Sequence, residues 1–323
     1  MRRGCGFNLN LLLLFLLLLL WYNPNTLEAT ATATPFSQML ALVQQEPVVL
    51  KYHKGPLLKG NLTLNLLWYG NFTLTQRSII LNFIQSLTVS SIHRGRTQSP
   101  SVALWWQTTA TYTGRPCTLT VGNQILDHTY SLGKSLKASQ LIALASTKTE
   151  ITADGYNRIH VVLTAADVAV EDFCMNQCGT HGSLRAGKKR VVYAWVGNPE
   201  SQCPGECAWP FHQPLYGPQT PPLVPPNGDV GMDGMVISLA TVLAGVVTNP
   251  FGNGYYQGTA MAPLEAVSAC TGMFGKGAYP GYAGEVPVDK RTGASYNAVG
   301  MRGRRFLLPA MWDPLTSSCK TLV

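Results

Sequence analysis

The amino-terminal segment constrains this chain most, because it determines the compartment in which the chain folds and the covalent links available there. Two arginines near the amino end precede an apolar run, Leu11–Leu20, in which one phenylalanine interrupts the leucines. Small residues follow at Ala29, Ala31 and Ala33, and we place the cleavage near Ala31. This order of charged, apolar and small residues is typical of a secretory signal peptide. We expect residues 1–31 to be removed and residues 32–323 to fold as one domain.

A membrane anchor is the alternative to a cleaved signal peptide. The apolar run from Leu11 to Tyr22 is well short of the roughly 20 residues with which a helix crosses a bilayer. A later apolar run, Met235–Val247, is interrupted by polar residues and glycine and also falls short. The sequence therefore predicts a secreted protein with no stable membrane insertion.

Cysteine usage agrees with export to an oxidising compartment. Cys5 lies in the expected signal peptide, which leaves seven of the eight cysteines in the mature chain. Cysteines of secreted proteins usually pair, so an odd number leaves one free thiol. The seven are Cys117, Cys174, Cys178, Cys203, Cys207, Cys270 and Cys319.

Two short motifs predict glycosylation of the secreted chain. Asn61 and Asn71 each begin an Asn-X-Thr sequon without proline at the middle position. We expect both asparagines to accept glycan.

The charge of the chain restricts its partners. The formal net charge is +8, or +7 without residues 1–31, which carry two arginines and one glutamate. A basic secreted protein is attracted to polyanions such as acidic wall polysaccharide. Nucleic acid is not expected as a partner, because the densest basic cluster, Lys188–Arg190, leads directly into the apolar run Val191–Val196.

Hydrophobic periodicity predicts an α/β domain, with α+β as the open alternative. Alternation over Leu62–Gly70 predicts a strand, and apolar residues at helical spacing in the next segment predict a helix capped by Thr75. The branched apolar runs Ile159–Thr164 and Arg190–Val196 predict two more strands. The segment Ser101–Tyr112 fits either a helix or a buried strand.

The carboxyl-terminal half is predicted to begin with one helix. Asp233 is expected to start it, and Pro250 prevents its continuation. The remainder, Phe251–Val323, is rich in glycine, tyrosine and proline but contains no low-complexity tract. We expect it to be an ordered, loop-rich extension.

Several motifs rich in Trp, Pro and Cys are highly specific. The strongest is the run Gln202–His212, preceded by Trp195–Asn198. Tyr52–Pro56, Leu67–Gly70 and Thr248–Gly254 are further matches. With these motifs the chain resembles the EXORDIUM, or phosphate-induced protein, family of plants from about Tyr52 to its carboxyl end.

This resemblance implies a fate and a role for the chain. It implies secretion to the apoplast and involvement in brassinosteroid-dependent growth, cell expansion and development, with no established reaction and no cofactor. It also leaves Cys117 outside the family pattern, as the unpaired thiol. The six cysteines that match the pattern are Cys174, Cys178, Cys203, Cys207, Cys270 and Cys319.

A fainter resemblance connects the helix expected after Asp233 to zinc peptidases. Those enzymes carry His-Glu-x-x-His or His-Glu-x-x-Glu on a helix, because ligands four residues apart share one face and the intervening Glu activates the metal-bound water. In this chain the corresponding positions are Thr241, Val242 and Gly245. None of these residues can ligate zinc or activate a metal-bound water as His and Glu do. The resemblance implies at most a degenerate zincin-like scaffold. A core helix that ends at a proline explains the same pattern.

The pairs Cys174/Cys178 and Cys203/Cys207, each followed by a histidine, would also fit a zinc site. Disulfides are favoured in an exported chain, so His181 and His212 are expected to be loop residues with local hydrogen bonds.

The sequence thus predicts a secreted, disulfide-stapled protein that acts by binding an extracellular protein or cell-wall polysaccharide, without catalysis. The alternative is a secreted hydrolase, either metallopeptidase-like or acting on the cell wall. Aromatic residues on the loops are candidates for recognition, although they could equally fill the core. They are Trp195, Trp209, Phe211, Tyr216, Tyr255 and Tyr256.

Overall fold

A five-stranded sheet organises the part of the chain that the structure describes. The computed structural model describes residues 47–88, 92–93, 96–97, 100–147, 157–175, 177–186, 189–217, 219–259, 262–279 and 281–323. The expected signal peptide lies outside these residues. Residues Pro47–Val323 form one compact unit.

The sheet is mostly parallel, with one antiparallel strand at its edge. β2, β5, β7 and β10 run parallel, and β9 pairs with β10 in the antiparallel sense. The inner strands β2 and β7 are buried almost throughout, as expected for a sheet covered on both faces. In sheet order the strands are β5 (Cys117–Asp127), β2 (Gly60–Tyr69), β7 (Arg158–Thr164), β10 (Lys189–Gly197) and β9 (Gly179–Ala186).

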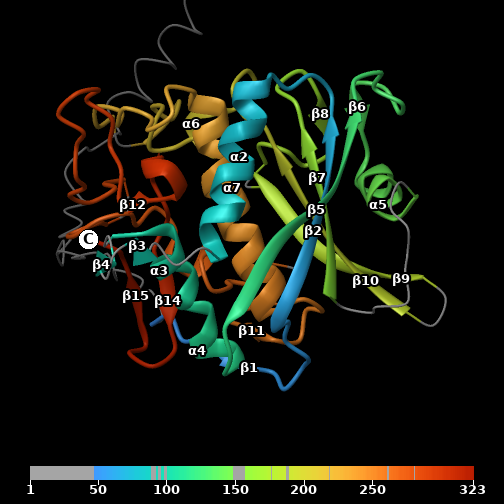
Figure 1. The fold of residues 1–323 in the computed structure, drawn as a ribbon, viewed down its shortest axis with the longest axis horizontal. Helices are drawn as coiled ribbons and strands as arrows, with labels where there is room; N and C mark the ends of the chain where they lie inside the picture. Colours follow the sequence, from blue (N-terminus) through green and yellow to red (C-terminus); the bar gives the residue numbers. More distant parts are fainter. Residues whose placement is uncertain are drawn as a thin grey trace, which may run out of the picture. The chain divides into compact units, whose positions relative to one another are not determined.

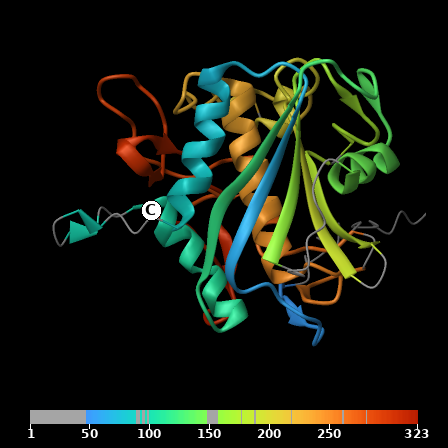
Figure 2. The same cartoon turned by 45° about the vertical axis from the view of Figure 1, so that its right-hand side comes forward.

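Helices cover both faces of this sheet (Figures 1 and 2). α2 (Leu74–Thr88) and α7 (Val230–Thr248) pack against one face, and α5 (Ala138–Thr147) packs against β7 and β10 on the other. The described residues therefore form a mixed α/β fold, as the sequence predicts. The sequence also predicts β2, β7, β10 and α2 at nearly the observed bounds.

The two long helices begin earlier than the sequence indicated. α2 starts with a capping box, in which the Thr73 hydroxyl accepts from Gln76 N–H and the Gln76 side chain accepts from Thr73 N–H, so Thr75 is not the cap. α7 is capped by Asp229, whose side chain accepts from Met232 N–H. Asp233 is instead buried inside the helix.

Asp233 is held by the segment that precedes α7. Its carboxylate accepts hydrogen bonds from the backbone and side-chain N–H groups of Asn227, at 2.8 and 2.6 Å. Burial nevertheless raises the pKa of Asp233 to about 7.

α7 is the central helix of the core and is buried on nearly all sides. Its 19 residues have a mean hydropathy of 1.9, so it is the one described helix long and apolar enough to cross a membrane. The helix thus extends beyond the apolar run Met235–Val247 at both ends. Because 83% of its apolar window is buried within the protein, the structure accounts for its composition as that of a core helix.

The segment Ser101–Tyr112 forms two short helices, which settles the alternative that the sequence left open. The Ser101 side chain caps α3 (Val102–Gln107) by accepting from Leu104 N–H, and α4 (Thr109–Thr113) follows directly.

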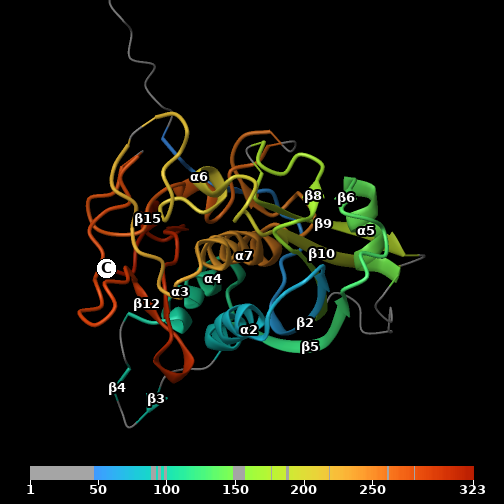
Figure 3. The same cartoon turned by 90° about the horizontal axis from the view of Figure 1, so that it is seen from above.

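The last loops of the chain, drawn in red, lie beyond α2 and α7, on the side away from the sheet (Figures 1 and 3), whereas the segment that carries Phe251 and Glu265 lies beside β10 and β9. The buried side chain of Asn297 fixes the last loops, because its Nδ2 donates to the carbonyls of Phe274 and Leu308 while its Oδ1 accepts from Leu308 N–H. The prediction of an ordered, loop-rich extension is thus confirmed for the described residues.

Small elements complete the fold. The helical ones are α6 (Pro204–Cys207), η2 (Ser268–Cys270) and η3 (Met301–Gly303). The two-stranded ladders are β1 (Lys51–Tyr52) with β11 (Tyr255–Tyr256), β3 (Ile92–His93) with β4 (Arg96–Thr97), β6 (Ser135–Leu136) with β8 (Ala169–Val170), β12 (Ala298–Val299) with β13 (Arg305–Phe306), and β14 (Met311–Asp313) with β15 (Ser318–Lys320).

Candidate functional site

Two segments that are far apart in the chain meet beside the carboxyl-terminal end of α7. Nε2 of His181, on β9, lies 2.8 Å from Oε2 of Glu265, in the loops that follow α7. The exposed fractions of the two side chains are only 12% and 14%. The His181–Glu265 pair therefore joins the edge strand of the sheet to the carboxyl-terminal loops.

The second carboxylate oxygen of Glu265 is also occupied. Oε1 accepts a hydrogen bond from Nδ2 of Asn249 at 2.7 Å, and Oδ1 of Asn249 accepts from Gly254 N–H at the same distance. Asn249 also ends α7, since its N–H donates to the Gly245 carbonyl. The end of the core helix thus positions the carboxylate.

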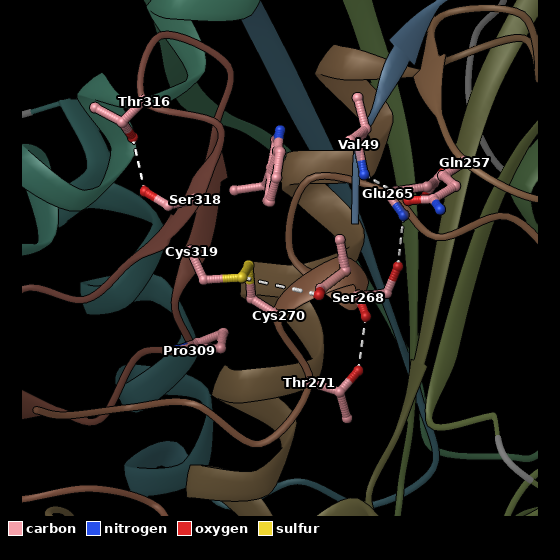
Figure 4. Close-up of a disulfide and its surroundings, with 12 residues drawn as sticks. Val49, Gln257, Glu265, Ser268, Cys270, Thr271, Pro309, Thr316, Ser318 and Cys319 are labelled. Carbon is pink, nitrogen blue, oxygen red and sulfur yellow. Dashed lines mark hydrogen bonds between the residues drawn. A yellow bond between two sulfur atoms is a disulfide. The ribbon is translucent and has the colours of Figure 1, made fainter. Parts of the chain in front are cut away.

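A disulfide anchors the loop that carries Glu265 (Figure 4). Ser268 lies between Glu265 and Thr271, with its Oγ accepting from Glu265 N–H and its carbonyl accepting from the Thr271 hydroxyl. Cys270 follows at once and is bonded to Cys319. The covalent link holds the site loop against the carboxyl terminus.

Gly245 is the α7 residue that allows the pair to approach the helix. A Cβ atom at this position would lie 2.5 Å from both Oε2 of Glu265 and Nε2 of His181. Real Cβ atoms essentially never approach another heavy atom within 3.0 Å. Any other residue here would have to separate the pair or displace the helix.

The three positions compared with zinc-peptidase donors have other contacts. The Thr241 hydroxyl donates to the Ile237 carbonyl at 2.9 Å, and Val242 is buried against Gly179 of β9. Gly245 supports the pair described above. Within the described ranges, no three His, Cys, Asp or Glu side chains gather as a metal site.

The pair lies in an open groove of about 820 Å³, which we call the β9 groove. β9 lines it from Gly179 to Ser183, and α7 contributes Thr241 and Val242. The Arg190 guanidinium stacks over the Phe251 ring at 4.8 Å, and both side chains line the groove. The groove therefore offers backbone, polar and aromatic surfaces together.

The backbone of β9 is open on its outer side. In the sheet of described residues β9 is the last strand, and Gly197 N–H donates to the Cys178 carbonyl. Hydrogen-bonded and non-hydrogen-bonded pairs alternate in an antiparallel ladder, so Thr180 and Gly182 face β10. The N–H and C=O groups of the odd-numbered residues point away from it. Those residues are Gly179, His181 and Ser183.

No described residue bonds to these outward backbone groups of β9. Unpaired N–H and C=O groups on an edge strand are a template for pairing with another chain. The β9 groove thus contains a row of donors and acceptors that no residue of the described ranges uses.

His181 is the main correction to the sequence analysis of this site. It is not a loop residue with a local bond, because it lies in β9 and its partner is 84 residues away. Nδ1 of its ring is buried and has no hydrogen-bond partner among the described residues. The expectation for His212 is confirmed, since its Nδ1 donates to the adjacent Gln213 carbonyl.

The sequence signal for β9 is weak. The strand reads Gly-Thr-His-Gly-Ser-Leu-Arg-Ala, without a run of apolar residues, and the cysteine-rich segment before it suggested one long loop. Nothing in the spacing of His181 and Glu265 relates the two residues.

Disulfides join all six cysteines that the family resemblance marked. The bonds are Cys174–Cys203, Cys178–Cys207 and Cys270–Cys319. Each cysteine of the Cys174/Cys178 pair is thus bonded to one cysteine of the Cys203/Cys207 pair. Cys117 is free and buried, and its burial raises the pKa of the thiol to about 12.

Both sequon asparagines are exposed. Asn71 lies in the loop between β2 and α2, whereas Asn61 is within β2 and accepts a hydrogen bond from the Thr118 hydroxyl at 2.6 Å. Of the loop aromatics, Trp195 and Phe211 are buried, while Tyr216 is 89% exposed.

Among the residues that the structure describes, the fold and the site define a mixed α/β protein with three disulfides and an open edge strand beside a partly buried His–Glu pair. No solved structure matches the chain, so the suggested zincin-like scaffold has no structural relative to support it. The conserved region of phosphate-induced protein 1 matches residues 50–322. The chain belongs to this family, the EXORDIUM or phosphate-induced proteins.

Curated relatives cover nearly the whole chain. Protein EXORDIUM-like 2 of Arabidopsis thaliana is 61% identical over 295 residues, which are 90% of this chain and 95% of the relative. Protein EXORDIUM of the same plant is 56% identical, with 87% and 93% covered. Protein PHOSPHATE-INDUCED 1 of Nicotiana tabacum is also 56% identical, with 88% and 92% covered.

Proposed function

We propose that this protein is secreted to the apoplast and takes part in growth control by binding an extended polypeptide segment in the β9 groove, without turnover. Secretion is supported by the amino-terminal sequence and by three disulfides, which persist in oxidising compartments. The role in brassinosteroid-dependent growth and development is the one that the family resemblance implies.

The observation that carries the binding proposal is the open edge of β9 within a groove. An extended peptide can add to an exposed sheet edge through main-chain hydrogen bonds, while neighbouring pockets receive alternate side chains. Gly179, His181 and Ser183 supply such bonds, and Arg190 and Phe251 lie beside them.

The geometry of His181 favours binding over hydrolysis. A general base needs a nitrogen within hydrogen-bond reach of the proton it removes. In His181, Nε2 is occupied by Glu265 and Nδ1 is buried, so neither nitrogen is open to a substrate proton in this geometry. The His181–Glu265 pair instead holds β9 in place against the loop that carries Glu265.

The proposal can be tested with peptides selected for binding. Random peptides of about ten residues, long enough to span β9, are selected on purified, disulfide-intact protein, and the best one is measured by fluorescence anisotropy. Ser183→Pro removes an outward N–H that β10 does not use, and Ser183→Ala is the matched control that keeps it.

We expect Ser183→Pro to weaken binding about tenfold, as for one lost hydrogen bond, and Ser183→Ala to have little effect. Mass spectrometry should recover the peptide intact after prolonged incubation. Equal binding by both variants would contradict addition to β9, and cleavage of the peptide that His181→Ala abolishes would establish the hydrolase alternative.

A further inference from the structure

A second hollow of about 630 Å³ lies apart from the β9 groove and shares no lining residue with it. Polar side chains of α2, including Asn82 and Gln85, form part of its lining. The rest comes from Pro226 and Asn227 and from the loops around residues 289–292 and 301–305. We call it the arginine pocket, because four arginines line it against one aspartate. They are Arg291, Arg302, Arg304 and Arg305, with Asp289.

Two of these arginines are fixed by the protein. The Arg304 guanidinium donates to Oδ1 of Asn227 at 2.8 Å and to the Ser78 hydroxyl at 3.4 Å. Arg305 forms an ion pair with Asp289 and stacks over the Tyr296 ring at 4.7 Å. Side chains held in this way lose less entropy when a ligand binds.

The other two arginines carry uncompensated charge. Among the described residues, no carboxylate pairs with Arg291 or Arg302, and both residues are exposed. The one acidic side chain of the lining, Asp289, is occupied by Arg305 and by the Arg291 N–H. The pocket is therefore positively charged, although Arg305 is neutralised.

We propose that the arginine pocket binds a carboxylated oligosaccharide, such as a short segment of an acidic wall polysaccharide. Arginine guanidinium groups match carboxylates in a planar, bidentate arrangement. The side chains of Asn82, Gln85 and Thr292 provide donors and acceptors for sugar hydroxyls.

The size of the pocket favours an oligosaccharide over a small inorganic anion. Its volume lies within the range of about 300–1,000 Å³ that is usual for sites of drug-sized ligands. More than one sugar ring fits, and the separate arginines can meet carboxylates on successive rings. This binding does not depend on the β9 groove.

The experiment is titration calorimetry of the secreted protein with galacturonate trimer, its methyl-esterified form and inorganic phosphate. Arg302→Gln and Arg291→Gln each remove one unpaired charge at an exposed position. Lys137→Gln is the matched control, because it removes an equal charge from an exposed residue beside α5. Thermal unfolding checks that each variant remains folded.

We expect the acidic trimer to bind, the esterified trimer to bind at least about tenfold more weakly, and each arginine variant to lose about tenfold in affinity, as for one charge-assisted hydrogen bond. Lys137→Gln should bind like the wild type. The proposal is overturned if the esterified trimer binds equally well, if inorganic phosphate binds as tightly as the trimer, or if all three variants lose affinity equally.

Discussion

A single methyl group added at Gly245 tests the contact between α7 and the His181–Glu265 pair. Inside an ordinary helix, Gly→Ala raises the free energy of unfolding by about 1 kcal/mol, because alanine loses less backbone entropy on folding. At Gly245 the new Cβ would lie 2.5 Å from Nε2 of His181 and from Oε2 of Glu265. The pair must therefore separate to admit it.

The expected magnitude follows from these two opposing effects. A hydrogen bond to a charged group contributes about 1.5–3 kcal/mol, and the helix gain offsets about 1 kcal/mol of its loss. We expect Gly245→Ala to lower the free energy of unfolding by about 0.5–2 kcal/mol, measured by urea titration of the disulfide-intact protein.

A double-mutant cycle separates this contact from a general effect on the helix. In a His181→Ala background the pair is already lost, and Oε2 of Glu265, without its partner, can move away from the new Cβ, so Gly245→Ala should stabilise the protein by up to about 1 kcal/mol. The difference between the two backgrounds should be about 1.5–3 kcal/mol. Stabilisation of the wild type by Gly245→Ala, equal to that in the His181→Ala background, would refute the proposed contact.

Three other predictions concern covalent links and titration. Replacing Cys270 and Cys319 by alanine should lower the free energy of unfolding by about 2–4 kcal/mol, measured by urea titration, because the bond closes a separation of 49 residues; an unchanged midpoint would contradict this. Burial lowers the pKa of His160 to about 4 from the ordinary value of 6.5, so an unfolded chain takes up a proton that the folded one resists. Stability should fall as the pH drops from about 6.5 towards 4, and His160→Gln should fall less over that interval in parallel urea titrations. The protein secreted by plant cells should begin near residue 32 and lose mass on peptide-N-glycosidase treatment; Asn71→Gln should remove one glycan, and identical glycan mass in that variant would exclude Asn71 as an acceptor.

The elements that the sequence predicted well are those whose burial produces a local pattern of apolar residues. β2, β7 and β10 are apolar runs because both faces of the sheet are covered, and α2 repeats apolar residues at helical spacing. The predicted helix starts were less accurate, because threonine or aspartate, which can cap a helix, occurs at more than one position near each start. Thr73 and Asp229 form the caps, while Asp233, with its buried carboxylate, satisfies Asn227.

Local sequence patterns of this kind could not predict the candidate site. β9 is a half-buried edge strand with two glycines, so neither alternation nor an apolar run marks it. His181 and Glu265 become neighbours through the order of strands and the Cys270–Cys319 link, which no local spacing encodes. Gly245 was noted only as a position that cannot ligate a metal, whereas its missing side chain is what admits the pair.

Amide hydrogen exchange on the protein, with and without a selected peptide, tests the binding of an extended segment to β9 most directly. Addition of the peptide to β9 should slow exchange at the outward N–H groups of Gly179, His181 and Ser183. Thr180 and Gly182, already bonded to β10, should change much less. Protection that appears elsewhere on the molecule and leaves these three amides unchanged would contradict it.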